Sequence, residues 1–231
     1  MPGADGTFAE HAKVPLENCI PLDKARLCDD LGYSLQDLAY IAFLLVPYGG
    51  LRDIKVEPGD TIIICPATGF YSSLGVQVAI AMGAKVIAMG RNQEKLVKLK
   101  DDIRSRSPGA NIETVQITGN EDQDVSALKS HGTIDAVLDI RPLRRGGRIS
   151  IMGSTKNIAV PEILVNNITL KGKMMYEREA VVSFVKMLQS GLFPQGKGFV
   201  ETKVFQLEDW KDGFDKGAEH NGIGKCVVFA P

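Results

Sequence analysis

One stretch, TIIICPATGFYSSLGVQVAIAMGAKVIAMGR at residues 61–91, constrains the fold more than any other part of the chain. It opens with the apolar and largely β-branched run Thr61–Cys65, which is too short for a helix and is typical of a strand buried on both faces. Apolar residues then recur at helical spacing from Leu74, and Gly83 is a residue type that ends helices. Lys85–Met89 reads as a second strand. The order strand, helix, strand predicts a βαβ unit, and hence an α/β fold with a doubly wound, mostly parallel sheet.

The turn between the first strand and the helix carries Ala67-x-Gly69-x-x-Ser72, where a dinucleotide-binding fingerprint carries three glycines. Gly69 holds the position at which bare backbone approaches a pyrophosphate on the helix N-terminus. Ala67 needs only to be small. Ser72 replaces the glycine that lets the helix pack closely on the strand. The pattern predicts a nucleotide site, while a tight turn without a ligand remains the alternative.

The end of the second strand indicates which dinucleotide would bind. Enzymes that prefer NAD usually place an acidic residue there to bind the ribose hydroxyls. This chain has Arg91 at that position and Lys95 nearby. A guanidinium attracts the 2′-phosphate of NADP(H), with the lysine as a second cation. We therefore predict NADP(H) as the cofactor, although a solvated arginine at a strand end is the alternative.

Composition excludes several other classes of protein. The 231 residues have a net charge of −1, which gives no indication of nucleic-acid binding. No apolar run reaches the ~20 residues that span a bilayer, and the N-terminus has no signal-peptide core, so the predicted location is cytoplasmic. The 4 cysteines and 3 histidines are scattered without metal-ligand spacing, and no metal site is predicted.

The rest of the chain continues the alternation of strands and helices. Ser34 is a plausible N-cap for a helical region reaching Ile54, which Pro47 is expected to kink or restart. Trp210 is expected in the core rather than at a ligand. Further elements are predicted at the following positions: strands at Glu113–Ile117, Ile134–Ile140, Arg148–Met152, Ile168–Lys171, Lys203–Leu207 and Lys225–Phe229, and helices at Glu121–Ser130, Glu177–Gln189 and Glu208–Glu219.

One connection departs from this alternation of strands and helices. Only Arg141–Gly147 separates the strands predicted at Ile134–Ile140 and Arg148–Met152. Parallel neighbours usually need a crossover of a dozen or more residues. We therefore expect that these two strands are not regular parallel neighbours, or that one of them frays. We also expect that a missing helix leaves Ile149 and Ile151 or their opposite neighbours facing water. The arginines crowded here predict a solvated basic loop, with an anion site as the less favoured alternative.

A series of motifs resembles, in the same order, the medium-chain dehydrogenases and reductases. They are GTFAEHAKVPLENCIPL, PYGGLRD, VEPGD, the ATG turn, MGAKVIAMGRNQEKL, GGRISIMG, ITLKG and the closing GKCVVFAP. The resemblance covers nearly the whole chain and is closest to a fungal branch of zinc-type alcohol dehydrogenase-like and quinone reductase-like proteins. It implies a Rossmann domain at 31–205, a remnant of a GroES-like catalytic domain at 1–30, and a C-terminal helix and strand at 206–231 that return toward that domain.

The resemblance also implies a function and a set of contacts. The expected activity is an NADPH-dependent oxidoreductase acting on a small carbonyl compound, alcohol or activated alkene, with a role in fungal secondary metabolism suggested by the branch and a homodimer left open. Backbone at Gly69, Phe70 and Tyr71 would contact the pyrophosphate. Backbone at four further residues would lie near the nicotinamide, namely Met152, Gly153, Lys173 and Met175. No catalytic residue is predicted.

Two further interpretations remain after the enzyme, which is the first. In the second, the chain is a truncated, non-catalytic nucleotide-binding remnant, or comes from an incomplete gene model of a complete enzyme. A methyltransferase on a similar sheet is the third interpretation, but such an enzyme would place an acidic residue where this chain has Arg91.

Overall fold

The structure is a computed structural model that describes residues 9–138, 145–153, 160–220 and 222–230. The chain divides into two compact units, one formed by Met1–Ala42 with Val181–Pro231 and the other by Phe43–Ala180. The strands are β1 Thr61–Ile64, β2 Lys85–Gly90, β3 Ile112–Gln116, β4 Ala136–Leu138, β5 Arg148–Ile151, β6 Thr169–Gly172, β7 Glu201–Phe205 and β8 Lys225–Phe229. The α-helices are α1 Ile41–Asp53, α2 Phe70–Ala81, α3 Gln93–Arg106, α4 Glu121–Lys129, α5 Val160–Val165, α6 Arg178–Gln189 and α7 Trp210–Glu219. Short 3₁₀ or π turns lie at Leu16–Asn18, Ala25–Asp30, Asp37–Tyr40, Gly196–Gly198 and Leu207–Asp209.

The unit formed by Phe43–Ala180 is built on a six-stranded sheet in the order β3-β2-β1-β4-β5-β6, and every pair of neighbours is parallel. Strand order reverses at β1, whose Ile63 lies opposite Ile87 of β2 on one side and Val137 of β4 on the other. This is the doubly wound α/β fold that the sequence predicts. In such a fold, ligands bind at the carboxyl ends of the strands around the reversal point.

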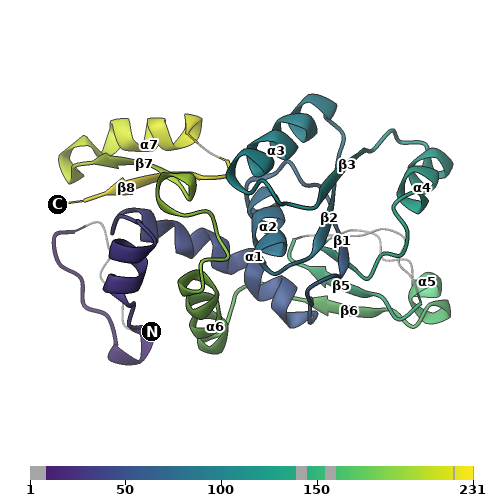
Figure 1. Ribbon diagram of the computed structural model, residues 1–231, viewed down its shortest axis with the longest axis horizontal. Helices are drawn as coiled ribbons and strands as arrows, with labels where there is room; N and C mark the ends of the chain where they lie inside the picture. The colour runs from purple at the N-terminus through teal and green to yellow at the C-terminus, as the bar shows by residue number, and fades with distance from the viewer. Residues whose placement is uncertain (1–8, 139–144, 154–159, 221, 231) are drawn as a thin grey trace. The chain divides into compact units, whose positions relative to one another are not determined.

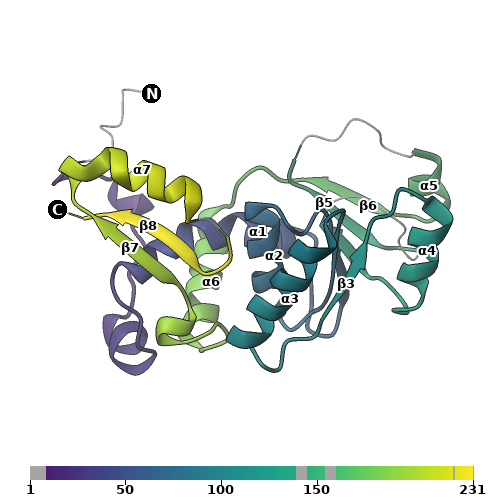
Figure 2. The same cartoon turned by 90° about the horizontal axis from the view of Figure 1, so that it is seen from above.

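Helices cover both faces of this sheet, with α2 and α3 on one side and α4 and α5 on the other (Figures 1 and 2). On the α4 side, Leu128 of the helix packs with Ile63, Met89 and Val137 of the strands, and all four side chains are buried. On the α2 side, Gly75 allows close packing, because a Cβ at this position would lie 3.1 Å from Leu138. The long apolar runs of β1 and β2 are therefore buried on both faces, as parallel strands require.

Two parts of the expectation about the link between β4 and β5 are wrong, namely that the strands are not parallel neighbours and that Ile149 faces water. The alternative, that one strand end frays into the connection, concerns residues up to Ile140 that lie outside the described residues and stays a prediction. The two strands are parallel neighbours, with Val137 opposite Ile149, and Ile149 is only 5% exposed. Because β4 ends at Leu138, nine residues connect the strands, and an extended chain of that length spans up to about 30 Å. A three-residue strand is only about 10 Å long, so nine residues are long enough to connect the two parallel strands. Residues 139–144, which include Arg141 and Arg144, lie outside the described residues.

Side chains anchor the start of β5. The Arg148 guanidinium donates hydrogen bonds to the backbone carbonyls of Ile54 and Lys55 and forms an ion pair with Asp60 at 2.6 Å. The Asp60 carboxylate also accepts from the N–H of Glu57 at 3.0 Å. Arg148 is therefore committed to the loop that precedes β1, and it does not contribute to a free basic patch.

The predicted helical region before β1 is partly confirmed. Ser34 and Asp37 exchange hydrogen bonds between the backbone N–H of each residue and the side chain of the other, which is the pattern of a capping box. The helix α1 then continues through Pro47 to Asp53 without restarting. Of the two alternatives expected at Pro47, the restart is therefore wrong, and the kink stays a prediction.

The other unit contains the parallel pair β7 and β8, with α7 lying along them (Figure 1). The Gly213 backbone of α7 lies against the Phe229 ring, where a Cβ would come within 2.4 Å. Trp210 is 50% exposed, and it stacks edge-on with Phe214, which is 54% exposed. The expectation that Trp210 lies in the core is therefore wrong.

Burial also raises the pKa of two groups in this unit. The Tyr33 hydroxyl donates to the Pro194 carbonyl at 3.1 Å, and burial raises its pKa to about 12. Burial raises the pKa of the Cys226 thiol to about 11. Across the described parts of both units, no helix has both the length and the apolar character needed to cross a bilayer.

Candidate functional site

The turn from β1 into α2 leaves an open helix N-terminus. Gly69 is the N-cap of α2, and no side chain caps this helix, whereas Asn92 and Asn120 cap α3 and α4 with hydrogen bonds of 2.9 and 3.1 Å. Gly69 is exposed and has a φ of −77°, which any residue adopts. A Cβ there would meet nothing closer than the Ser72 hydroxyl at 3.6 Å. The fold itself does not require glycine here, but a ligand lying on the backbone would.

The neighbouring residues of this turn have different roles. Ala67 is fully buried, and its N–H donates to the Met89 carbonyl at 2.6 Å, which joins the turn to β2. The Phe70 ring packs edge-on against Phe43 at 5.4 Å between centroids. Tyr71 is 49% exposed and lines a cavity described below. A cis peptide bond joins Cys65 to Pro66.

The end of β2 presents two cations. Arg91 and Lys95 are both exposed, and among the described residues neither side chain makes a hydrogen bond or an ion pair. Asn92 lies between them and accepts from the Lys95 N–H at 2.9 Å. The Arg91 carbonyl accepts from the Gln116 side chain at 3.1 Å, one residue beyond the last backbone bond between β2 and β3. The backbone of this turn is held in place while its two positive charges remain available to an anion.

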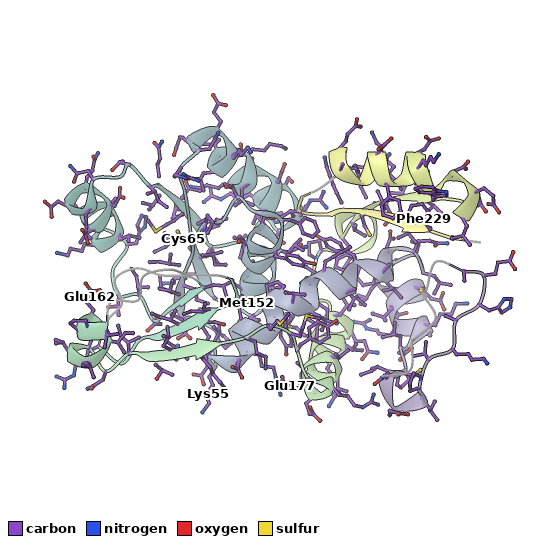
Figure 3. The ribbon with its side chains drawn as sticks, turned by 180° about the vertical axis from the view of Figure 1, so that it is seen from behind. Lys55, Cys65, Met152, Glu162, Glu177 and Phe229 are labelled. Carbon is purple, nitrogen blue, oxygen red and sulfur yellow. The ribbon has the colours of Figure 1, made fainter. Side chains whose placement is uncertain are left out.

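A cavity of about 270 Å³ brings together residues from α1, the β1–α2 turn, β4 and β5. Four of the predicted site residues line it: Tyr71, Ser72, Met152 and Gly153. Sequence reasoning missed its other walls, which are Val46, Pro47, Cys65, Pro66, Leu138 and Ser150. Figure 3 labels Cys65 and Met152, which approach the cavity from the ends of β1 and β5. The only sequence feature that pointed to these missed walls was the polar Ser150 between two isoleucines of a buried strand.

Lys173 and Met175 lie elsewhere. Both line a separate hollow of about 480 Å³ with Asp53 and Glu177. The Lys173 ammonium forms ion pairs with Glu177 and, at 3.8 Å, with Asp53. Its hydrogen bond to Glu177 lowers the pKa of that carboxyl. The Lys173 N–H bonds to the Ile151 carbonyl, so the side chain and the amide are both engaged within the protein.

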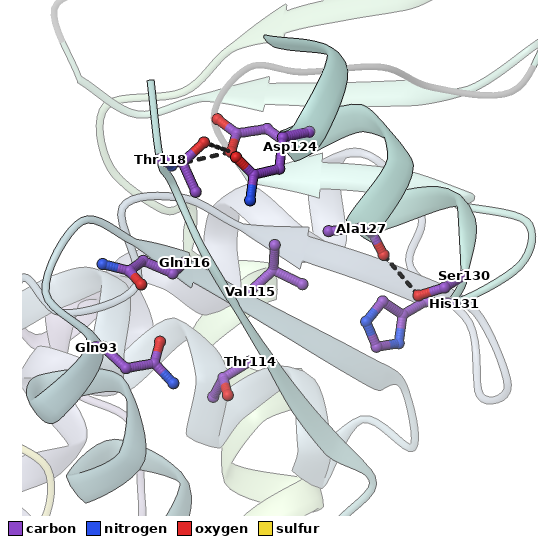
Figure 4. Close-up of a pocket in the computed structure, with 10 residues that line it drawn as sticks. Gln93, Thr114, Val115, Gln116, Thr118, Asp124, Ala127, Ser130 and His131 are labelled. Carbon is purple, nitrogen blue, oxygen red and sulfur yellow. Dashed lines mark hydrogen bonds between the residues drawn. The ribbon is translucent and has the colours of Figure 1, made fainter. Parts of the chain in front are cut away.

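A polar cavity of about 530 Å³ lies between β3 and α4, next to the Arg91 turn (Figure 4). Gln93 and Gln116 line it close to that turn, and His131 lines its other end. The Asp124 carboxylate is 2% exposed and accepts hydrogen bonds from the N–H and the hydroxyl of Thr118, at 2.9 and 2.7 Å. Among the described residues, no group of three or more His, Cys, Asp or Glu side chains could hold a metal ion.

The curated proteins that resemble this chain include an acryloyl-coenzyme A reductase and alcohol dehydrogenases. No model of a known protein family matches the chain. The acryloyl-coenzyme A reductase of Sulfurisphaera tokodaii is 24% identical over 97% of this chain and 65% of its own length. Alcohol dehydrogenase 1 of Emericella nidulans is 27% identical over 81% of this chain and 55% of its own length. The chain therefore spans between about half and two thirds of these relatives.

Solved structures show the same fold. The quinone oxidoreductase of Thermus thermophilus, described in complex with NADPH, has a TM-score of 0.65 at 23% identity, over 96% of this chain and 74% of its own. Other similar proteins are named NAD-dependent alcohol dehydrogenases. The relatives come from several different organisms, so the narrower fungal branch is not confirmed.

Proposed function

We propose that this chain, a relative of the medium-chain alcohol dehydrogenases and reductases, binds NADP(H) and acts as an oxidoreductase. Its substrate would be a small carbonyl compound, alcohol or activated alkene. The observation that carries the proposal is the pairing of an uncapped helix N-terminus at Gly69 with the unpaired cations Arg91 and Lys95 at the next strand end. When bound, the nicotinamide ring supplies the hydride chemistry.

Each part of this arrangement suits one part of the dinucleotide. The free N–H groups and the dipole at the start of α2 favour the pyrophosphate, which can approach because Gly69 has no side chain. The Arg91 guanidinium supplies a charge-assisted contact that only a 2′-phosphate can use. The cavity beside Tyr71 and Met152 has mostly apolar walls, which suits a flat pyridine ring.

Cofactor titration tests the proposal. NADPH should bind more tightly than NADH, and Arg91→Asp should reverse that order, because the carboxylate repels the 2′-phosphate and accepts from free ribose hydroxyls. Lys85→Asp is the matched control, since it makes the same charge change at the opposite end of β2, where the side chain is also exposed. The control should keep the preference for NADPH. Equal affinity of the unmodified protein for both cofactors would remove the basis of the NADP(H) assignment.

A nucleotide-binding protein without catalysis is the second candidate, because the chain spans only part of its relatives and no acid–base residue is assigned. Turnover of NADPH with a panel of quinones, aldehydes and enoyl compounds separates the two. Tight NADPH binding with no turnover above the rate without protein would favour the second candidate.

We also propose a homodimer. β6 is the last strand of the sheet order, and no strand among the described residues pairs with its outer edge. The adjoining helix α5 exposes Val160, Leu164 and Val165 by 55%, 71% and 75%. Exposed apolar side chains beside an open strand edge are typical of an interface. Sedimentation should give twice the mass of the 25.0 kDa chain. Leu164→Glu should give the monomer, and a monomeric unmodified protein would contradict this proposal.

A further inference from the structure

The Ser150 hydroxyl is an exception among the buried polar groups of the sheet. Ser150 lies in the middle of β5 and is 0% exposed, and its Oγ has no hydrogen-bond partner in the described part of the chain. Nearly all buried polar groups in folded proteins are hydrogen-bonded, because an unpaired group loses its bonds to water without replacement. A serine in this position needs a physical explanation.

The surroundings of Ser150 point to a ligand. The residue lines the 270 Å³ cavity that Tyr71 and Met152 also line. Ser150 and Met152 are two apart in the chain, so they face the same side of the sheet. The Gly50 backbone leaves room for both: a Cβ there would lie 3.0 Å from the Ser150 Oγ and 2.3 Å from the Met152 Sδ. Ser150 therefore lies at the wall of a mostly apolar cavity, with its buried hydroxyl packed beside the Gly50 backbone.

We propose that the Ser150 hydroxyl is a positioning group that hydrogen-bonds the carboxamide of a bound nicotinamide ring. This inference rests on the proposed function, because it assumes a nicotinamide dinucleotide. A pyridine carboxamide combines a flat apolar ring with one small polar group that both donates and accepts. The cavity offers the matching combination of Pro47, Pro66 and Leu138 as apolar walls with one buried hydroxyl that has no partner, beside the more exposed Tyr71 and Ser72. A bond to the carboxamide would fix which face of the ring is presented.

Two measurements on Ser150→Ala should move in opposite directions. Without cofactor, the melting temperature should rise by a few degrees, since the variant removes an unpaired polar group from the interior. The affinity for NADPH should fall about three- to tenfold, which corresponds to the loss of one hydrogen bond. The affinity for NADH should fall by the same factor, because both cofactors carry the same carboxamide.

A ligand without nicotinamide tests whether Ser150 contributes to affinity through the nicotinamide ring. 2′-Phospho-ADP-ribose retains the phosphates and the adenosine but has no ring to reach Ser150, so its affinity should be the same for the unmodified protein and for Ser150→Ala. The near-isosteric Ser150→Cys keeps a weak donor and should bind NADPH with intermediate affinity. It also serves as the second variant if the alanine protein folds poorly.

Ser73→Ala is the matched control. Ser73 is 6% exposed, and its hydroxyl already donates to the Phe70 carbonyl at 2.7 Å. The same change should therefore leave the melting temperature equal or lower and the NADPH affinity unchanged. The inference is overturned if Ser150→Ala binds NADPH as tightly as the unmodified protein, or loses affinity for 2′-phospho-ADP-ribose equally, or melts lower as a satisfied hydroxyl would. An unmodified protein that binds no dinucleotide would overturn the proposed function itself.

Discussion

The two halves of the six-stranded sheet are built differently. In the half formed by β3, β2 and β1, the strands have four to six residues and are linked by helices of 12 and 14 residues. In the half formed by β4, β5 and β6, the strands have three or four residues, and α5 has six. Backbone ladders hold both halves, and in the second half the Arg148 side chain adds bonds from the start of β5 to the loop before β1.

This difference bears on the proposed cofactor site. The 2′-phosphate end would lie on the first half, at the end of β2, and the nicotinamide end on the second, at the end of β5. Arg91 follows directly after β2 and its carbonyl is held by the Gln116 side chain, whereas Ser150 lies within β5, whose start Arg148 anchors. Stability and cofactor affinity should therefore respond differently to changes in the two halves.

The largest effect on stability should come from the anchor of β5. Arg148→Ala should lower the free energy of unfolding by about 3 kcal/mol, because it leaves Asp60, whose side chain is only 17% exposed, without its counter-ion. Two backbone carbonyls would also lose their donor. Chemical denaturation at neutral pH measures the difference.

Lys100→Ala is the matched control in the other half. Lys100 pairs with Glu113 at 2.7 Å, but the Glu113 side chain is 46% exposed, so the loss should stay below about 1 kcal/mol. Arg148→Ala should also weaken NADPH binding, and Lys100→Ala should not. Equal losses of stability from the two variants would contradict the proposed difference between the halves.

A smaller and more selective effect is expected at Gln116. Its amide donates to the Arg91 carbonyl and extends the link between β2 and β3 beyond the last backbone bond. Gln116→Ala should weaken NADPH binding about three- to fivefold and leave NADH binding unchanged, as expected for a hydrogen bond worth about 1 kcal/mol that orients the Arg91 turn. Gln123→Ala, in the same cavity, is the control and should change neither. Parallel losses for both cofactors would show that Gln116 does not act through the 2′-phosphate.

Local sequence signals predicted the first half well. The strand, helix and strand over Thr61–Gly90 follow from short-range periodicity and from Gly83, which has the left-handed φ of +87° expected at a helix end. Gly69 and Arg91 were predicted as site residues because their positions relative to a strand end carry meaning, and their contacts with a cofactor stay predictions. Each depends on neighbours within a few residues, so no knowledge of packing was needed.

Long-range packing explains what was missed in the second half. The cavity collects Pro47 from α1, Leu138 from β4 and Ser150 from β5, which no single stretch of sequence connects. The error about β4 and β5 had another origin, because the crossover rule describes the helix that usually covers a sheet and not the reach of the chain. The prediction that Trp210 is buried was wrong, because an aromatic residue on an amphipathic helix is buried only if another element covers that face.

The smallest expected effect concerns pH and the pair at the edge of the first half. A hydrogen bond from Lys100 holds the pKa of Glu113 below its ordinary value of 4.5. A carboxyl with a lowered pKa stabilises the folded state above its unfolded pKa, and this stabilisation is lost as the pH falls through the folded value. The difference in stability between the unmodified protein and Glu113→Gln should therefore be constant above about pH 5.5, and should shrink as the pH falls below 4.5. Because the side chain is half exposed, the difference should stay under about 1 kcal/mol. A double-mutant cycle with Lys100→Met, followed by urea denaturation between about pH 3 and 7, isolates the pair from the other carboxyls. A coupling energy that stays constant down to about pH 3 would mean that Lys100 does not stabilise the ionised form of Glu113.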